Sequence, residues 1–216
     1  MKSYEYLFFD LDGTLTDPAE GITKSVAYAL KKFGIEVEDR RALLPFIGPP
    51  LFDSFRDFYG FSDEDADRAV EYYREYFRVD GIFDNSVYEG IPELLARLKS
   101  AGKKLVLATS KPEEFARRIM DKFELARYFD VIAGATFDGS ISQKVEVIEY
   151  AIRTAGIADR SSVLMIGDRF HDVVGAKKAG IDSLGVLFGY GDRRELEDAG
   201  ATYIAGTVED LGQMLI

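Results

Sequence analysis

Short apolar runs alternate with amphipathic segments over most of the chain. The runs are rich in branched and aromatic residues, as buried strands are, and they lie at residues 6–9, 104–108, 131–133, 163–166, 183–187 and 202–205. Helical periodicity fills the segments at residues 92–101, 113–123, 143–155, 173–179 and 193–199. Strands that alternate with helices are typical of a parallel sheet with helices on both faces. The pattern therefore predicts an α/β fold.

One long segment interrupts this alternation. Residues 19–33 have a helical pattern, and about 50 residues after them are also helical in pattern, rich in aromatic residues and without a strand-like run. We expect the aromatic side chains to form a small core of their own. Two domains are therefore predicted: residues 1–17 and 86–216 form the sheet domain, and residues 18–85 form an inserted helical domain.

Composition and charge narrow the class of protein. The 216 residues are 47% hydrophobic and 30% charged, as in ordinary globular proteins, and no apolar run is long enough for a membrane span or a signal sequence. We expect a cytoplasmic protein, either a monomer or a homodimer. The absence of cysteine excludes disulfides and thiolate chemistry. A net charge of −11 disfavours nucleic acid as a partner, whereas a small anion can still bind where a metal or a lysine supplies local positive charge.

The first apolar run ends in two carboxylates, Asp10 and Asp12. Because two such groups repel each other at the mouth of an apolar sheet, the pattern predicts a divalent cation beside them. A plain hairpin turn at Asp12-Gly13 is an alternative. A calcium loop is excluded, because it requires a carboxylate or amide at its fifth position and a glycine at its sixth, where this chain has Thr14 and Leu15.

Other predicted strands also end in polar residues. Thr109 and Ser110 follow the second run, Asp168 follows the fourth with Asp172 four residues later, and Lys144 opens the helix after the third run. Ligands of open parallel sheets bind at the carboxyl ends of the strands. We therefore expect these side chains to meet Asp10 and Asp12 at one rim.

Most of these residues have a structural alternative. Ser110 begins a capping box at the next helix start, and Asp172 could cap the helix that follows it. Thr109 has no capping role, so it is the preferred phosphate contact. Lys144 in a first helical turn opposes the helix dipole, and this mild misfit favours a functional role. His171, the single histidine, is expected to be an exposed loop residue and not a general base.

In their order and spacing, these residues resemble the four motifs of the haloacid dehalogenase superfamily, and most closely those of its phosphoglycolate phosphatase-like branch. That branch carries a helical cap inserted after the first motif. The resemblance implies a Rossmann-like parallel sheet core with an inserted α-helical cap domain that closes over the cleft. The matching segments are Asp10-Leu11-Asp12-Gly13-Thr14, Thr109-Ser110, Lys144, Gly167-Asp168 with Asp172, and Gly189-Tyr190-Gly191.

The resemblance also implies the hydrolysis of a small phosphorylated metabolite, a phosphoglycolate-like monoester, in two steps. Asp10 would attack phosphorus and form an aspartyl-phosphate. Asp12 would protonate the leaving oxygen and then accept a proton from water. Thr109, Ser110 and Lys144 would bind the phosphoryl group.

Mg²⁺ is the cofactor that the resemblance implies. The Asp10 carboxylate, the Asp12 backbone carbonyl and Asp168 would hold the ion. Asp172 would act from outside this set or through a water molecule.

Several alternatives stay open. Within the superfamily they are a 5'-nucleotidase, a pyrophosphatase and a β-phosphoglucomutase-like sugar phosphomutase. Asp12 argues against dehalogenase chemistry, and Ile22 stands where similar phosphomutases carry a histidine at the cap hinge. A phospho-acceptor signalling module of another class also gathers acids, a hydroxyl and a lysine, but such modules lack the inserted cap and the second acid. A catalytically dead binding protein is disfavoured, because no motif acid is missing.

Overall fold

The computed structural model describes residues 1–216, which form two compact units. The first unit comprises Met1–Asp17 and Val87–Ile216, and the second comprises Pro18–Ser86. The second unit extends one residue beyond the predicted insertion, residues 18–85. Two short strands, β2 (Thr16–Asp17) and β3 (Ser86–Val87), form a separate two-stranded sheet where the chain leaves and re-enters the first unit.

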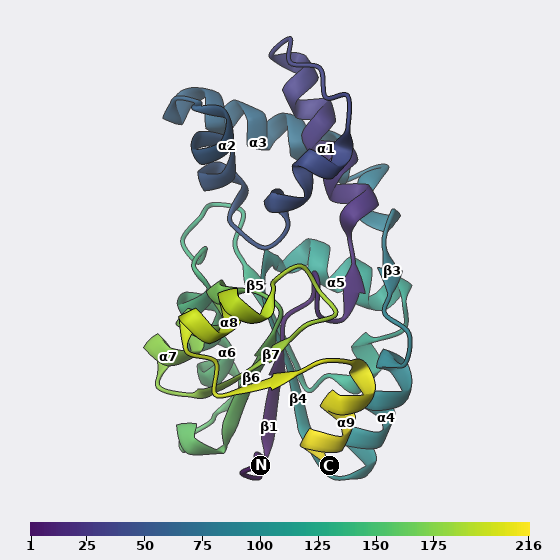
Figure 1. Cartoon of the computed structure of the whole chain (residues 1–216), viewed down its shortest axis with the longest axis vertical. Helices are drawn as coiled ribbons and strands as arrows, with labels where there is room; N and C mark the ends of the chain where they lie inside the picture. Colours follow the sequence, from purple (N-terminus) through teal and green to yellow (C-terminus); the bar gives the residue numbers. More distant parts are fainter. The chain divides into compact units, whose positions relative to one another are not determined.

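A six-stranded sheet forms the centre of the first unit (Figure 1). Its order is β5-β4-β1-β6-β7-β8, and each neighbouring pair is parallel. The predicted parallel α/β sheet is therefore confirmed. The strands are β1 (Tyr6–Phe9), β4 (Lys104–Pro112), β5 (Val131–Ala135), β6 (Val163–Gly167), β7 (Asp182–Val186) and β8 (Tyr203–Ala205).

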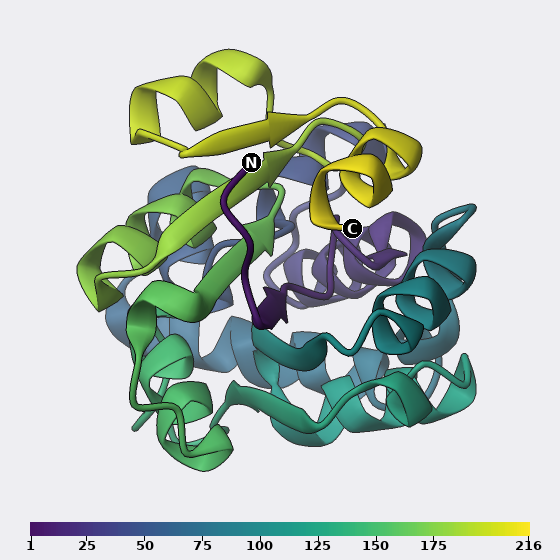
Figure 2. The ribbon, with the colours of Figure 1, turned by 90° about the horizontal axis from the view of Figure 1, so that it is seen from below.

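Helices lie on both sides of this sheet (Figure 2). One face is covered by α6 and α7, whose apolar side chains form one buried cluster with Phe8, Val106 and Met165. The helices of the first unit are α4 (Ile91–Ser100), α5 (Glu113–Lys122), α6 (Lys144–Ala155), α7 (Phe170–Ala179), α8 (Arg193–Ala199) and α9 (Val208–Leu215), with short 3-10 turns η3 (Ala126–Tyr128) and η4 (Arg160–Ser162).

Strand β1 is buried on both faces. Phe8 points into the cluster with α6 and α7, and its neighbours Leu7 and Phe9 face the other side because side chains alternate along a strand. Phe9 contacts Phe129 edge-to-face, with ring centroids 6.1 Å apart. The strand order reverses at β1, since β4 and β5 lie on one side and β6 to β8 on the other. The carboxyl end of β1 is thus the place where a doubly wound sheet opens a ligand-binding crevice.

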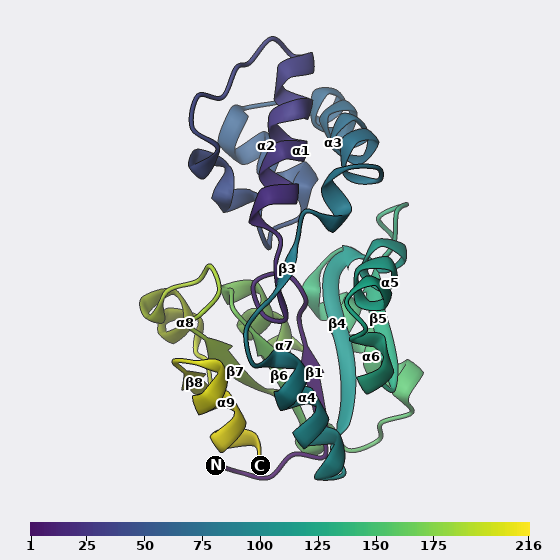
Figure 3. The same ribbon diagram turned by 90° about the vertical axis from the view of Figure 1, so that its right-hand side faces the viewer.

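The structure corrects the end of one predicted strand and the start of one predicted helix, and it adds a helix. Strand β4, a long strand in Figure 3, continues through Pro112 instead of ending at residue 108. Its register with β5 shifts between Thr109 and Pro112. Helix α7 begins at Phe170 instead of residue 173. Helix α9 was not predicted.

None of the helices has both the length and the apolar composition that crossing a membrane requires.

The second unit is a helical bundle with an aromatic core. Phe55 is fully buried and contacts Phe46 and Phe61, with ring centroids 5.1 and 5.9 Å away. Phe58 is 49% exposed, so the aromatic stripe is only partly core. The elements are α1 (Ala19–Lys32), η1 (Arg40–Phe46), α2 (Leu51–Tyr59), α3 (Asp63–Phe77) and η2 (Gly81–Phe83).

Candidate active site

A tight turn after β1 fixes the first two acids. The Asp10 N–H donates to the Ile166 carbonyl of β6 at 2.9 Å, so Asp10 still belongs to the rigid sheet. Gly13 has a φ of +81°, a conformation that disfavours any side chain, and its N–H donates to the Thr16 carbonyl at 2.8 Å. Both Asp10 and Asp12 are buried. The turn therefore holds two carboxylates out of water at the carboxyl end of β1.

Lys144 joins three elements through its ammonium group. Its Nζ lies 2.9 Å from Asp10 Oδ1 and 2.8 Å from Asp172 Oδ1, and it donates to the Ala108 carbonyl at 3.1 Å. Burial works to lower the pKa of Lys144, but the charges of Asp10 and Asp172 raise it well above its usual value. The lysine is the first residue of α6, as predicted, and it stays charged among the acids.

Asp168 follows β6 and is almost fully buried. Its Oδ1 accepts a long hydrogen bond from Thr14 Oγ1 at 3.4 Å, and its Oδ2 accepts the Tyr190 N–H at 2.8 Å. Burial raises the pKa of Asp168 well above its usual range, and the charges of Asp172 and Asp10 raise it further. The charge of Arg169 and the hydrogen bond from Tyr190 lower the pKa of Asp168, but they do not offset the effect of burial and of the two acids.

Asp172 does cap α7, as the structural alternative predicts, but it does so from inside the helix and not from before it. The helix begins at Phe170, and the Asp172 carboxylate accepts the Arg169 N–H at 3.1 Å from the third helical position. Its other oxygen faces Lys144. Burial raises the pKa of Asp172 to about 6, even though Lys144 lowers it.

Three of the predicted acids form one buried cluster. Ligand oxygens of Asp10, Asp168 and Asp172 all lie within 4.8 Å of one another. Carboxylate oxygens are the donors that Mg²⁺ and other hard divalent cations prefer, and a single lysine leaves this cluster with excess negative charge. The residues present therefore fit a divalent cation. The side chain of Asp12 is not part of the cluster.

Asp12 instead pairs with a second buried lysine that the sequence analysis missed. Lys111 Nζ lies 2.7 Å from Asp12 Oδ2, and the lysine side chain is only 5% exposed. Burial raises the pKa of Asp12, although Lys111 lowers it. The signal in the sequence is a lysine that directly follows a buried strand and two hydroxyl residues, but the same segment also has the pattern of a helix start.

Thr109 and Ser110 lie within the extended β4. The Thr109 hydroxyl is buried and accepts the Lys111 N–H at 3.2 Å, and Thr109 follows Ala108, whose carbonyl binds Lys144. Ser110 is half-buried. The predicted Ser110 capping box is wrong, because Pro112 is the N-cap of α5 and no side chain bonds there.

His171 is not the exposed loop residue that we expected. It lies in the first turn of α7, half-buried, and its ring packs against Phe170 with centroids 3.8 Å apart. Burial, together with the charges of Arg169 and Lys144, lowers the pKa of His171 to about 4. The imidazole is therefore neutral at pH 7.

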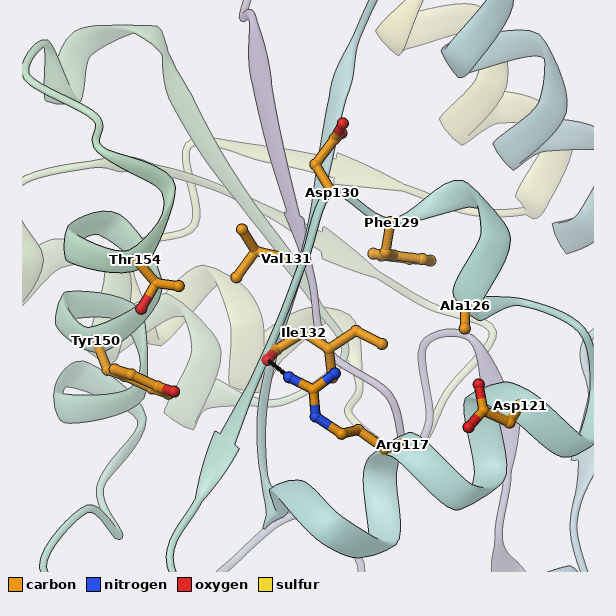
Figure 4. A pocket seen from close by; sticks show the side chains of 9 residues that line it. All are labelled: Arg117, Asp121, Ala126, Phe129, Asp130, Val131, Ile132, Tyr150 and Thr154. Atoms are coloured by element: carbon orange, nitrogen blue, oxygen red, sulfur yellow. Dashed lines mark hydrogen bonds between the residues drawn. The ribbon is translucent and has the colours of Figure 1, made fainter.

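A separate cavity lies at the edge strand β5 (Figure 4). The Arg117 guanidinium donates to the Ile132 carbonyl at 3.0 Å beside it. The lining contains neither the acid cluster nor the buried lysines, so this cavity is distinct from the candidate site. It is lined by Arg117, Asp121, Ala126, Phe129, Asp130, Val131, Ile132, Tyr150 and Thr154.

Comparison with known proteins finds relatives along nearly the whole chain. A family model described as "Haloacid dehalogenase-like hydrolase" matches residues 7–186. A 5'-nucleotidase of Pseudomonas aeruginosa is 45% identical over 212 residues, covering 98% of this chain and 96% of that protein. The tyrosine-protein kinase PtkA of Mycobacterium tuberculosis is 39% identical, covering 99% of this chain and 73% of that protein. Among solved structures, a predicted phosphatase from Clostridium acetobutylicum has a TM-score of 0.96 and 50% identity, covering 99% of each chain.

Gly13→Ala should destabilise the protein more than Gly102→Ala. The two glycines have similar φ angles of +81° and +78°, so both variants incur a backbone penalty of about 1–2 kcal/mol. Only at Gly13 would the new Cβ meet another group, Asp168 Oδ2 at 2.1 Å, while nothing lies within 4 Å at Gly102. We expect urea unfolding to show an additional loss of about 1–3 kcal/mol for Gly13→Ala. Equal losses in the two variants would contradict a rigid contact between the turn and Asp168.

Proposed function

The chain belongs to the haloacid dehalogenase-like hydrolase family, and from this we propose that it is a Mg²⁺-dependent phosphatase that hydrolyses a phosphate monoester through an aspartyl-phosphate. The resemblance seen in the sequence is thereby confirmed at the level of the family. The observation that carries the proposal is the position of Asp10. It lies at the end of the central strand, bound to Lys144 and within one cluster with Asp168 and Asp172.

Asp10 is the proposed nucleophile. One of its oxygens forms a bond to phosphorus while the bond from phosphorus to the leaving oxygen breaks, and Asp12 gives that oxygen a proton. In the second step a water oxygen bonds to phosphorus, the bond to Asp10 breaks, and Asp12 takes the proton of the water. Lys144 supports this role because it holds Asp10 Oδ1 at 2.9 Å from its ammonium group.

Mg²⁺ would be held by Asp10, Asp168 and the backbone carbonyl of Asp12, with Asp172 outside this set. When bound, the ion supplies positive charge that neutralises the oxygens of the transferring phosphoryl group. The assignment of Asp172 is supported by its contacts, since one of its oxygens faces Lys144 and the other accepts the Arg169 N–H.

Thr109, Ser110 and Lys144 are the proposed phosphate-binding residues. Lys144 contributes a buried cation, and Thr109 contributes a buried hydroxyl one residue after the Ala108 carbonyl that Lys144 contacts. Donors held rigidly in a water-poor site stabilise transferred charge more strongly than water does. The inserted helical domain, residues 18–85, is proposed to act as the cap that selects the leaving group.

Two classes of substrate are favoured. The sequence motifs point to a phosphoglycolate-like monoester, and the 45% identical relative named a 5'-nucleotidase favours nucleoside 5'-monophosphates. Both are small phosphorylated metabolites. The two classes differ in the leaving group and share the phosphoryl chemistry proposed for Asp10.

A substrate panel separates these classes. Purified protein with Mg²⁺ should release inorganic phosphate from at least one phosphate monoester among 2-phosphoglycolate, nucleoside 5'-monophosphates and hexose phosphates. Pyrophosphate belongs in the same panel. Interconversion of hexose phosphate isomers without phosphate release would instead identify a mutase, and absence of turnover on every compound would overturn the proposal.

Removal of divalent metal should abolish turnover. With EDTA followed by desalting, we expect phosphate release to fall to background and to return on addition of Mg²⁺, because the acid cluster then regains its compensating cation. Addition of Ca²⁺, which prefers longer bonds and more ligands, should restore much less activity. Full activity in metal-free protein would contradict the assignment of Asp10 and Asp168 as ligands.

Asp10→Asn should eliminate turnover while the fold is kept. The substitution preserves the shape of the side chain but replaces the nucleophilic carboxylate with a weakly nucleophilic amide, so we expect a loss on the order of 10³-fold or more. Asp121→Asn on the exposed surface of α5 is the matched control and should retain wild-type activity. Circular dichroism checks that both variants fold. Substantial hydrolysis by folded Asp10→Asn protein would rule out Asp10 as the nucleophile.

A further inference from the structure

We propose that Lys111 is a positioning residue that orients the acid–base group Asp12 and leaves one of its oxygens, Oδ1, for proton exchange with the leaving group. This inference rests on the proposed phosphatase function and extends it to a residue outside the motifs that the sequence analysis recognised.

The first observation is an ion pair that involves only one of the two carboxylate oxygens of Asp12. Lys111 Nζ lies 2.7 Å from Asp12 Oδ2, and both side chains are almost completely buried. Asp12 Oδ1 is also buried, but it has no hydrogen-bond partner. A buried carboxylate oxygen without a partner is unfavourable unless a bound group completes it. The geometry therefore makes Oδ1 the atom that can meet the leaving oxygen.

The second observation is the backbone that delivers Lys111. The register of β4 against β5 shifts between Thr109 and Pro112, and such bulges redirect side chains next to functional sites. The Thr109 hydroxyl accepts the Lys111 N–H at 3.2 Å within the bulge. On the neighbouring strand, a Cβ at Gly134 would lie 2.7 Å from the Lys111 carbonyl oxygen and 2.6 Å from Glu113 Cα. Glycine at this position thus allows the bulge that turns the lysine into the site.

The third observation is a division between the two buried lysines. Lys144 contacts Asp10 and Asp172, whereas Lys111 contacts Asp12. Removing the Lys111 charge therefore leaves the ion pairs of the nucleophile in place. The effect should fall on proton transfer by Asp12 and not on phosphoryl binding by Lys144.

The test follows the proton that Asp12 exchanges in the two proposed steps. When the bond from phosphorus to the leaving oxygen breaks, the proton on Asp12 Oδ1 passes to that oxygen, and in the second step Oδ1 recovers a proton from the attacking water. An alkoxide leaving group needs this proton, whereas p-nitrophenolate leaves readily without it. Because kcat/KM reports the steps through the first irreversible one, comparing it between these two leaving groups separates proton donation from substrate binding and nucleophilic attack.

We would compare kcat/KM of Lys111→Met and wild type on two substrates, p-nitrophenyl phosphate and the best alkyl phosphate from the panel. The expected loss is about 10²–10⁴-fold on the alkyl phosphate and about tenfold or less on p-nitrophenyl phosphate, since general acid catalysis contributes the difference. Lys178→Met, on the exposed last turn of α7, is the matched control and should behave as wild type on both substrates.

Two further variants keep the proposal falsifiable. Lys111→Arg retains the charge and should recover part of the alkyl phosphate activity, and it carries the comparison if Lys111→Met does not fold. Asp12→Asn should show the same split between substrates, and adding Lys111→Met to it should cause little further loss, because both residues act through one group.

Equal losses on the two substrates, or additive losses in the double variant, would overturn the role of Lys111 while leaving the phosphatase proposal intact. If wild-type protein hydrolyses neither substrate, the proposed function itself fails.

Discussion

Burial of like charges at one end of the sheet is the constraint on which the candidate site depends. Four carboxyl groups and two ammonium groups are withdrawn from water there: Asp10, Asp12, Asp168, Asp172, Lys111 and Lys144. Removing one partner from a buried ion pair commonly costs about 3–5 kcal/mol, because the other charge is then left uncompensated. Each lysine therefore fixes the carboxylates that it contacts. The remaining excess of negative charge favours a divalent cation in the same place.

The apolar sheet and the helices packed on it hold these buried charged groups in place. Asp10 follows directly after β1, a strand buried on both faces, and its N–H is still bonded to β6. Lys144 and Asp172 belong to the first turns of α6 and α7, which pack against each other and against the sheet. A carboxylate held on these elements cannot rotate into water and away from the neighbouring charged groups. The hydrophobic core thus stabilises an electrostatic arrangement that would disperse on flexible loops.

The sequence predicts the parts of this site that lie at the ends of regular elements. The apolar run before Asp10 and the helical periodicity after Lys144 place both residues at the sheet rim, and the parallel sheet confirms that reasoning. Lys111 was missed for a physical reason: the β4 bulge depends on the neighbouring strand, and the segment Ser110-Lys111-Pro112-Glu113 has the local features of a helix start. The early start of α7 was missed because Asp172 was interpreted as the cap of a helix that begins at residue 173, whereas it is the third residue of that helix. Local patterns report local preferences, whereas side-chain pairing depends on contacts between strands.

Separate lysine partners give two neighbouring acids different chemical capacities. Asp10 and Asp12 are two residues apart, and in a common environment they would compete for the same proton and the same cation. Lys144 instead holds Asp10 with the cluster, while Lys111 holds Asp12 away from it. Burial raises the pKa of Asp12, which favours the protonated form that a general acid requires. The proposed division of work between Asp10 as nucleophile and Asp12 as acid would follow from the lysine that each carboxylate contacts, because different environments allow two like groups to take different roles.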